Sequence, residues 1–215
     1  RERKPLGIIF LGGSREDFSE DTSSFKVPCV IVTTSAENWS MEELSSVAID
    51  DEKAGETIVD YLIEHGHTKI AEIGANLELS QTAILRHNGY LNSFKKHGIT
   101  PDERYYERAR FSYDSAYHAM KKLLEKNIEI TAVYAISDVM AIGAIRAILD
   151  KGLRVPEDIS ITGFDGSTLA EYYNPKIVSI RQPHKDMAAR SVELLFSMID
   201  LHKGSCHEII PFELT

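Results

Sequence analysis

Cysteine is scarce in this chain, and its scarcity excludes two kinds of scaffold. Only Cys29 and Cys206 occur among the 215 residues, and they form no C-x-x-C pair. A metal cluster or a disulfide framework needs more cysteines at closer spacing. We therefore expect two small, buried or half-buried thiols in a reducing compartment.

Basic residues and long apolar runs are also in short supply. The chain has 24 lysines and arginines against 33 aspartates and glutamates, which is a formal net charge of −9. Binding a nucleic-acid backbone requires a basic protein surface, so this balance argues against such binding by the chain itself. No apolar run approaches the roughly 18 residues of a membrane span. The start, "RERKPLGIIFLGGSRED", turns acidic too soon for a signal peptide, so we expect a cytoplasmic protein without membrane contact.

The usual patterns of catalytic and metal sites are missing as well. The histidines show no H-x-x-x-H spacing, and neither a G-x-S-x-G elbow nor a P-loop lysine occurs. We predict no catalytic residue, no metal and no cofactor. An enzyme on an α/β fold stays an alternative, which turnover of a bound ligand would revive.

What the sequence does contain is an alternation of short apolar runs with longer amphipathic stretches. Strands are predicted over 6–11, 29–32, 46–49, 69–74, 105–111, 131–136, 159–164, 177–180 and 208–214. Helices are predicted over 50–66, 80–98, 114–127, 138–152, 168–173 and 184–204. Strands separated by helices of this length indicate βαβ units, and therefore an α/β fold with parallel sheets.

Two aspartates lie at or just after the ends of predicted strands. Asp138 comes after "TAVYAIS" and Asp165 ends "ISITGFD". Ligand crevices of such sheets lie beyond the carboxyl ends of the strands, so both residues are candidates for ligand contact. The alternative for Ser137 or Asp138 is helix capping, because both are good N-cap residues. Asp165 is explained less well by a cap, because no strongly periodic helix follows it.

Several motifs together resemble a known family. "AVYAISDVMAIGAIRAILDKGLRVPEDISITGFDG" followed by "EYYNPKIVSIRQP" is similar to the C-terminal signature of the lactose/galactose repressor family of bacterial transcription regulators. The upstream segments "IDDEKAGETIVDYLIEHGHTKIAEIG" and "RHNGYLNSF" match the same family in the same order. The resemblance covers nearly the whole chain, and it is strongest from residue 46 onward.

The resemblance implies a periplasmic-binding-protein-like fold, in which two doubly wound parallel-sheet lobes, joined by three crossovers, close over a small effector. The crossovers are expected near Asp50, Gln182 and Ser205. The N-terminal lobe would comprise 1–49 and 183–205, and the C-terminal lobe 50–182 and 206–215. We expect the N-terminal lobe to be incomplete, because family members carry further βα units and a helix-turn-helix headpiece before a stretch like "KPLGIIFLGG".

The family's effector contacts map onto five residues of this sequence. Arg86 matches an arginine that reaches the effector, and Asp165 matches the aspartate of a G-[FY]-D motif. Phe111 matches an aromatic that stacks on the ligand, with plain core packing as its alternative. The others are Ser137 and Gln182, whose alternatives are a helix cap and a hinge position. Thr33 is a further polar candidate, after the "CVIV" strand.

The function that the resemblance implies is effector sensing and dimerisation in a repressor-type regulator. Ile142 and Tyr173 are expected at the interface of a homodimer in the full-length protein. The effector is expected to be a sugar, with a purine or a sugar phosphate as alternatives. Operator DNA would bind only through the headpiece, which this chain lacks. The alternative function is the solute-binding protein of a sugar importer, which a signal peptide in the full gene product would favour.

Overall fold

The computed structural model describes residues 5–13, 27–39, 41 and 43–215 of the chain. It divides into two compact units, and the chain passes between them after Asp50, Gln182 and Phe212. The α/β class and the plan of two lobes with three crossovers are confirmed. Among the described residues, no helix combines the length and apolarity needed to cross a membrane.

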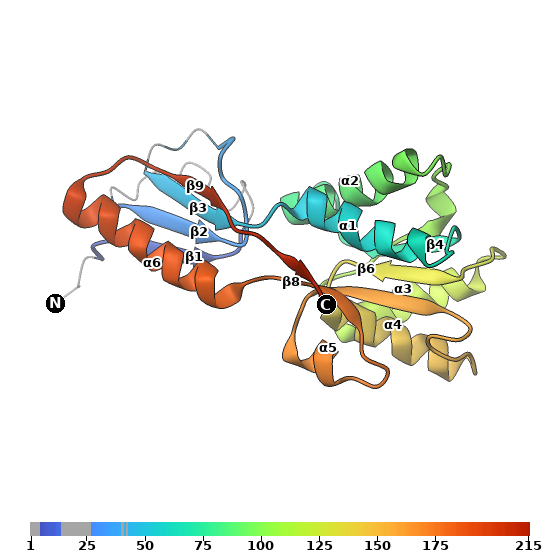
Figure 1. The fold of residues 1–215 in the computed structure, drawn as a ribbon. Coiled ribbons are helices and arrows are strands. Elements are labelled where there is room, and N and C mark those ends of the chain that lie inside the picture. Colours follow the sequence, from blue (N-terminus) through green and yellow to red (C-terminus); the bar gives the residue numbers. More distant parts are fainter. Residues whose placement is uncertain (1–4, 14–26, 40, 42) are drawn as a thin grey trace. The chain divides into compact units, whose positions relative to one another are not determined.

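The first unit contains a parallel sheet with the strand order β1-β2-β3-β9. Its strands are β1 (Ile8–Leu11), β2 (Cys29–Val32), β3 (Leu44–Ala48) and β9 (His207–Ile209). Helix α6 (His184–Leu201) packs along this sheet, as Figure 1 shows in orange-red. Every residue of β2 is buried, as expected for a central strand that is covered on both faces. Trp39 is also buried, in a cluster with Cys29, Ile31, Ala36 and Leu44, so it is a core residue.

The second unit contains a six-stranded sheet with the order β10-β8-β7-β6-β4-β5. The strands are β4 (Ile70–Gly74), β5 (Tyr106–Arg108), β6 (Ala132–Ala135), β7 (Ser160–Asp165), β8 (Val178–Arg181) and β10 (Glu213–Leu214). All of these strands pair in parallel except β10, which runs antiparallel to β8.

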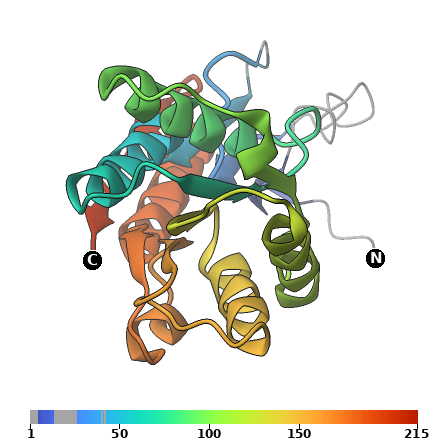
Figure 2. The same cartoon turned by 90° about the vertical axis from the view of Figure 1, so that its right-hand side faces the viewer.

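Helices cover both faces of the second sheet. They are α1 (Asp51–Glu64), α2 (Gln81–Lys96), η2 (Glu103–Tyr105), α3 (Tyr113–Glu125), α4 (Asp138–Asp150) and α5 (Thr168–Tyr172). Figure 2 shows α1 and α2, in teal and green, on one face, with α3 and α4, in yellow-green and yellow, on the other. This doubly wound layering makes the carboxyl edge of the sheet the expected place for a ligand.

Glycines allow α1 and α2 to cross at close range. A Cβ on Gly89 would lie 2.3 Å from the Glu52 carbonyl oxygen, and one on Gly55 would lie 2.6 Å from the Arg86 carbonyl oxygen. Because no larger residue fits at either position, the crossing holds the start of α1 against the middle of α2. It thereby sets Arg86 beside Asp51.

The C-terminal segment departs from the prediction. The single strand predicted over 208–214 is two strands, β9 and β10, which belong to different sheets. Pro211 lies between them, and it has no N–H to continue a ladder. Residues 206–212 lie in the first unit because β9 pairs in parallel with β3. Their predicted place in the C-terminal lobe, and the predicted crossover near Ser205, are therefore wrong.

Candidate functional site

Arg86 is the centre of a polar cluster at the carboxyl edge of the second sheet. Its Nε donates to Asp51 Oδ1 at 2.8 Å, and its Nη1 donates to the Ile136 carbonyl oxygen at 2.6 Å. The same Nη1 lies 3.7 Å from Asp165 Oδ1, and the guanidinium carbon lies 3.5 Å from the centre of the Phe164 ring. The fork geometry of arginine permits all of these contacts at once.

Burial and neighbouring charges shift the pKa of Arg86 in opposite directions. Only 3% of the residue is exposed. Burial lowers the pKa of Arg86, but the carboxylates of Asp51 and Asp165 outweigh this effect and leave the pKa above its ordinary value. The guanidinium therefore stays charged, and its orientation is set before any ligand arrives.

Asp165 closes the cluster from the end of β7. Its Oδ1 accepts a hydrogen bond of 2.9 Å from Gln182 Nε2, and 33% of its side chain is exposed. The backbone of Asp165 has a φ of 105°, a region that residues other than glycine rarely adopt. Strained backbone of this kind gathers at functional sites, because the surrounding structure must hold it in place.

Three of the five predicted effector residues thus meet in space. Arg86 comes from α2, Asp165 from β7 and Gln182 from the residue after β8. An ion pair joins Arg86 to Asp165, and a hydrogen bond joins Gln182 to Asp165. Ser137 lies next along the chain from Ile136, but its hydroxyl caps α4 by accepting from the Met140 N–H at 3.3 Å.

Phe111 lies past the carboxyl end of β5 and is 49% exposed. Its alternative as a core residue is wrong.

The side chain of Asp138 has a structural role. Its Oδ2 accepts from the Ser167 N–H, and its Oδ1 accepts from the Ser179 hydroxyl, both at 2.6 Å. The carboxylate fills the space above Gly163, where a Cβ would lie 2.3 Å from Oδ1. Asp138 therefore joins the start of α4 to β8 and to the turn that carries Asp165.

Thr33, in the first unit, also has a backbone conformation that is rare outside glycine. Thr33 follows β2 with a φ of 73°, and its N–H donates to the Val47 carbonyl at 2.9 Å. It lies at the carboxyl edge of its own sheet, so its place in the fold matches that of Asp165.

The two predicted interface residues, Ile142 on α4 and Tyr173 at the end of α5, are half-buried. More apolar surface is exposed on their neighbours: Leu149 and Leu169 are each 50% exposed and Tyr172 is 81% exposed. The family resemblance predicts Tyr173 at the interface, whereas its neighbour Tyr172 presents the larger exposed surface.

The sequence patterns did not reveal a second pair of titratable side chains in this unit, the half-buried His87 and the buried Glu72. His87 Nδ1 lies 2.7 Å from Glu72 Oε2, and Glu72 is 1% exposed. Burial raises the pKa of Glu72 despite its pairing with His87. Burial lowers the pKa of His87, but the hydrogen bond and charge of Glu72 outweigh it and leave the pKa raised. The available signal was a glutamate at the centre of the apolar strand "KIAEIG".

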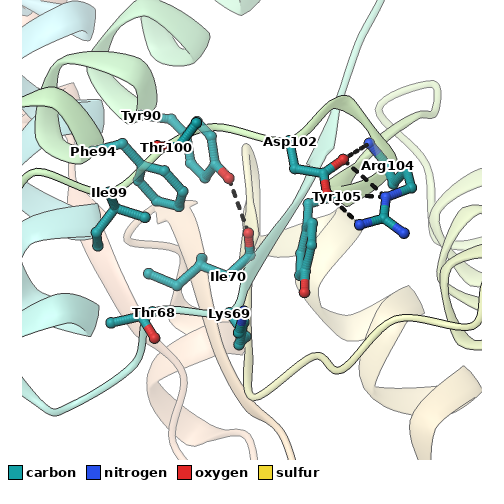
Figure 3. Close-up of a pocket in the computed structure, with 10 residues that line it drawn as sticks. All are labelled: Thr68, Lys69, Ile70, Tyr90, Phe94, Ile99, Thr100, Asp102, Arg104 and Tyr105. Carbon is teal, nitrogen blue, oxygen red and sulfur yellow. Dashed lines mark hydrogen bonds and ion pairs between the residues drawn. The ribbon is translucent and has the colours of Figure 1, made fainter.

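A pocket of about 310 Å³ lies at the opposite edge of the sheet. It surrounds the amino end of β4, where Tyr90 donates to the Ile70 carbonyl and Arg104 pairs with Asp102 at 2.7 Å (Figure 3). Because ligand crevices in doubly wound sheets lie at the carboxyl edge, this pocket does not compete with the Arg86 cluster. Within the described ranges, no group of His, Cys, Asp and Glu residues is arranged to hold a metal ion.

Comparison with known proteins gives concordant matches. A family model described as a periplasmic binding protein-like domain matches residues 59–215. The HTH-type transcriptional regulator MalR of Clostridium butyricum is 38% identical over 216 residues, which is 100% of this chain and 64% of that protein. Catabolite control protein A of Priestia megaterium is 35% identical over 190 residues, covering 88% of this chain and 56% of that protein. The chain thus spans less than two thirds of the length of these relatives.

Solved structures that resemble this chain also include those of transcription regulators. A complex of the transcriptional regulator CelR with cellobiose superposes with a TM-score of 0.89 at 30% identity, over 98% of this chain and 64% of that one. The transcription regulator CcpA of Lactococcus lactis gives a TM-score of 0.85 at 27% identity, over 98% of this chain and 76% of that one.

Proposed function

This chain belongs to the lactose/galactose repressor family, in its periplasmic-binding-protein-like part, and we propose that it senses a small effector for a transcription regulator. The observation that carries the proposal is the Arg86 cluster, in which a buried guanidinium is already held 3.7 Å from a partly exposed carboxylate. We assign no contact with operator DNA to these residues. The chain binds its effector without converting it.

The chemistry of the cluster favours a sugar. Arg86 supplies N–H donors, whereas Asp165 supplies carboxylate oxygens that accept from hydroxyl groups. The exposed ring of Phe111 offers a flat apolar surface for the C–H face of a sugar ring. The solved complex of a related regulator with cellobiose supports this class of effector. The ligand screen that tests this preference for a sugar also includes purines and sugar phosphates.

The test is a calorimetric titration with the sugars and nucleobases that first shift the thermal unfolding of the chain. We expect Asp165→Asn to weaken effector binding by about tenfold to a hundredfold, because a charge-assisted hydrogen bond contributes about 1.5–3 kcal/mol. Asparagine suits this position better than alanine because it tolerates a positive φ.

Asp158→Asn is the matched control. Its side chain is 31% exposed and is also paired with an arginine, Arg154 at 2.8 Å, but it precedes β7 at the amino edge of the sheet. This variant should bind the effector like the wild type. Wild-type affinity in Asp165→Asn would show that the effector binds elsewhere.

We also propose that the face formed by α4 and α5 supports a homodimer in the full-length protein. In this chain alone we expect at most a weak dimer, and we expect Ile142→Asp to raise its dissociation constant about tenfold or more by burying a charge. Light scattering over a concentration series measures this. Ile84→Asp, at a 39% exposed position on α2, is the control that should leave association unchanged. A tight dimer that Ile142→Asp does not disturb would contradict this assignment.

A further inference from the structure

A second cavity lies on the α2 face of the second unit, away from the Arg86 cluster. Its volume is about 600 Å³, within the range of small-molecule sites. Leu77, Leu91 and Pro101 contribute apolar surface, and the rings of Tyr90 and Tyr106 contribute aromatic surface. Hydrogen bonds hold both rings, because Tyr90 donates to the Ile70 carbonyl and Tyr106 donates to the Ala75 carbonyl.

The Glu72–His87 pair also lines this cavity. His87 engages one carboxylate oxygen of Glu72, and the other, Oε1, has no hydrogen-bond partner among the described residues. Burying a carboxylate is costly unless its oxygens are paired, and His87 satisfies only one of them. When it is ionised, such a group produces a negative potential in its low-dielectric surroundings.

Glu72 belongs to a polar row across the sheet. The parallel register sets Thr162, Tyr134, Glu72 and Tyr106 side by side on β7, β6, β4 and β5. The hydroxyls of Tyr134 and Thr162 are buried and, like Glu72 Oε1, lack partners among the described residues. Packing of the sheet does not require polar side chains at these four positions, because apolar residues of similar volume would fit as well.

The cavity is separate from the proposed effector site. Its lining residues include none of Arg86, Asp165 and Gln182. The contacts of Arg86 lie at the carboxyl ends of β6 and β7, whereas His87 contacts Glu72 on β4 and packs edge-on against the Tyr106 ring at 5.2 Å.

The charges around the cavity favour a cation. Carboxylates line it at Glu72, Asp102 and Glu103, and among the described residues that line it the only basic side chain is His87. Arg104 neutralises Asp102 through a 2.7 Å ion pair, which leaves Glu72 and Glu103 in excess over His87. Tyrosine rings also attract a cation to their faces.

We propose that this cavity is a second small-ligand site, specific for a primary amine carried on a flat apolar or aromatic body. The ammonium group would lie toward Glu72, and the body would pack between the apolar wall and the tyrosine rings. Anionic ligands such as sugar phosphates are excluded by the same charges. This proposal does not depend on the identity of the effector.

The experiment uses two probes that share a ring and differ in charge, tyramine and 4-hydroxyphenylacetate. NMR titration of the 215-residue chain follows the imidazole signals of His87. We expect saturable shifts with tyramine and at least about tenfold weaker binding of the acid, which corresponds to the loss of one favourable charge interaction. Absence of a saturable shift with tyramine, or equal affinity for both probes, would overturn the proposal.

Two variants locate the binding. Leu91→Trp, at a half-buried position of the wall, should abolish tyramine binding by filling the cavity. Glu72→Gln keeps the shape and should remove most of the preference for the amine over the acid. Asp165→Asn should bind tyramine like the wild type. Unchanged tyramine binding in Leu91→Trp would place the amine elsewhere and overturn the proposal. If a variant fails to fold, the comparison of tyramine with 4-hydroxyphenylacetate on the wild-type chain still tests the proposal.

Discussion

Arg86 and His87 are neighbours on α2, and each pairs with a buried carboxylate, but the two pairs are built differently. Arg86 contacts Asp51, Asp165 and the Ile136 carbonyl, so its donors are directed at several acceptors. His87 contacts a single oxygen of Glu72 and leaves the other without a partner in the described part of the chain. The first arrangement is preorganised, as the proposed effector site requires, whereas the second is a partly satisfied group beside a cavity.

The largest expected effect concerns the better-satisfied pair. Asp51→Ala removes the carboxylate closest to Arg86 and leaves a buried guanidinium with weaker compensation. We expect the free energy of unfolding to fall by about 3–5 kcal/mol, as for other buried pairs that lose one partner. Urea denaturation measures it.

Asp150→Ala provides the comparison, because its partner Arg146 is 71% exposed. A surface pair of this kind contributes about 1 kcal/mol or less. If the two variants lose equal stability, the Arg86 cluster is not the buried, tightly coupled unit described above.

The second prediction concerns pH and applies to the Glu72–His87 pair. The pKa of each group is raised in the folded protein from its ordinary value, 4.5 for Glu72 and 6.5 for His87. Over the range above these values the folded state therefore binds more protons than the unfolded state, so raising the pH reduces stability. The free energy of unfolding of the wild type relative to Glu72→Gln should fall as the pH rises from 4.5 to beyond 6.5.

Denaturation series at several pH values measure this difference. Nearby Tyr90, Tyr106 and Tyr134 do not contribute, because burial raises the pKa of each of them above its ordinary value of 10. A difference that grows with pH would show that Glu72 is held as a carboxylate whose pKa is lowered.

The smallest effect, and the only expected gain, concerns the polar row. Tyr134→Phe removes a buried hydroxyl that has no partner in the described residues, so we expect stability to rise by about 1 kcal/mol. Tyr90→Phe is the matched variant, because it loses a hydrogen bond of 3.0 Å to the Ile70 carbonyl and should cost about 1 kcal/mol. A loss of similar size in both variants would mean that the Tyr134 hydroxyl is satisfied.

The order and type of the helices and strands followed from the alternation of apolar runs, because the period of burial is a local property of the chain. The position at the end of a predicted strand and the family resemblance both indicated Asp165, whereas the resemblance alone indicated Arg86. The structure holds the two side chains 3.7 Å apart. The C-terminal strand was predicted wrongly because "EIIPFEL" looks like one apolar run, although Pro211 and the competition of two sheets divide it.

The sequence by itself determined the α/β class, the family and the position of polar residues at the ends of strands. Only the tertiary structure decided which charges are paired and which are not. Asp51 is 35 positions from Arg86, and Glu72 is 15 positions from His87, so neither pairing is visible in local periodicity. The crossing of α1 and α2 selects one pair, and the register of β4 beneath α2 selects the other. Pairing depends on long-range packing, which a local pattern of burial does not specify.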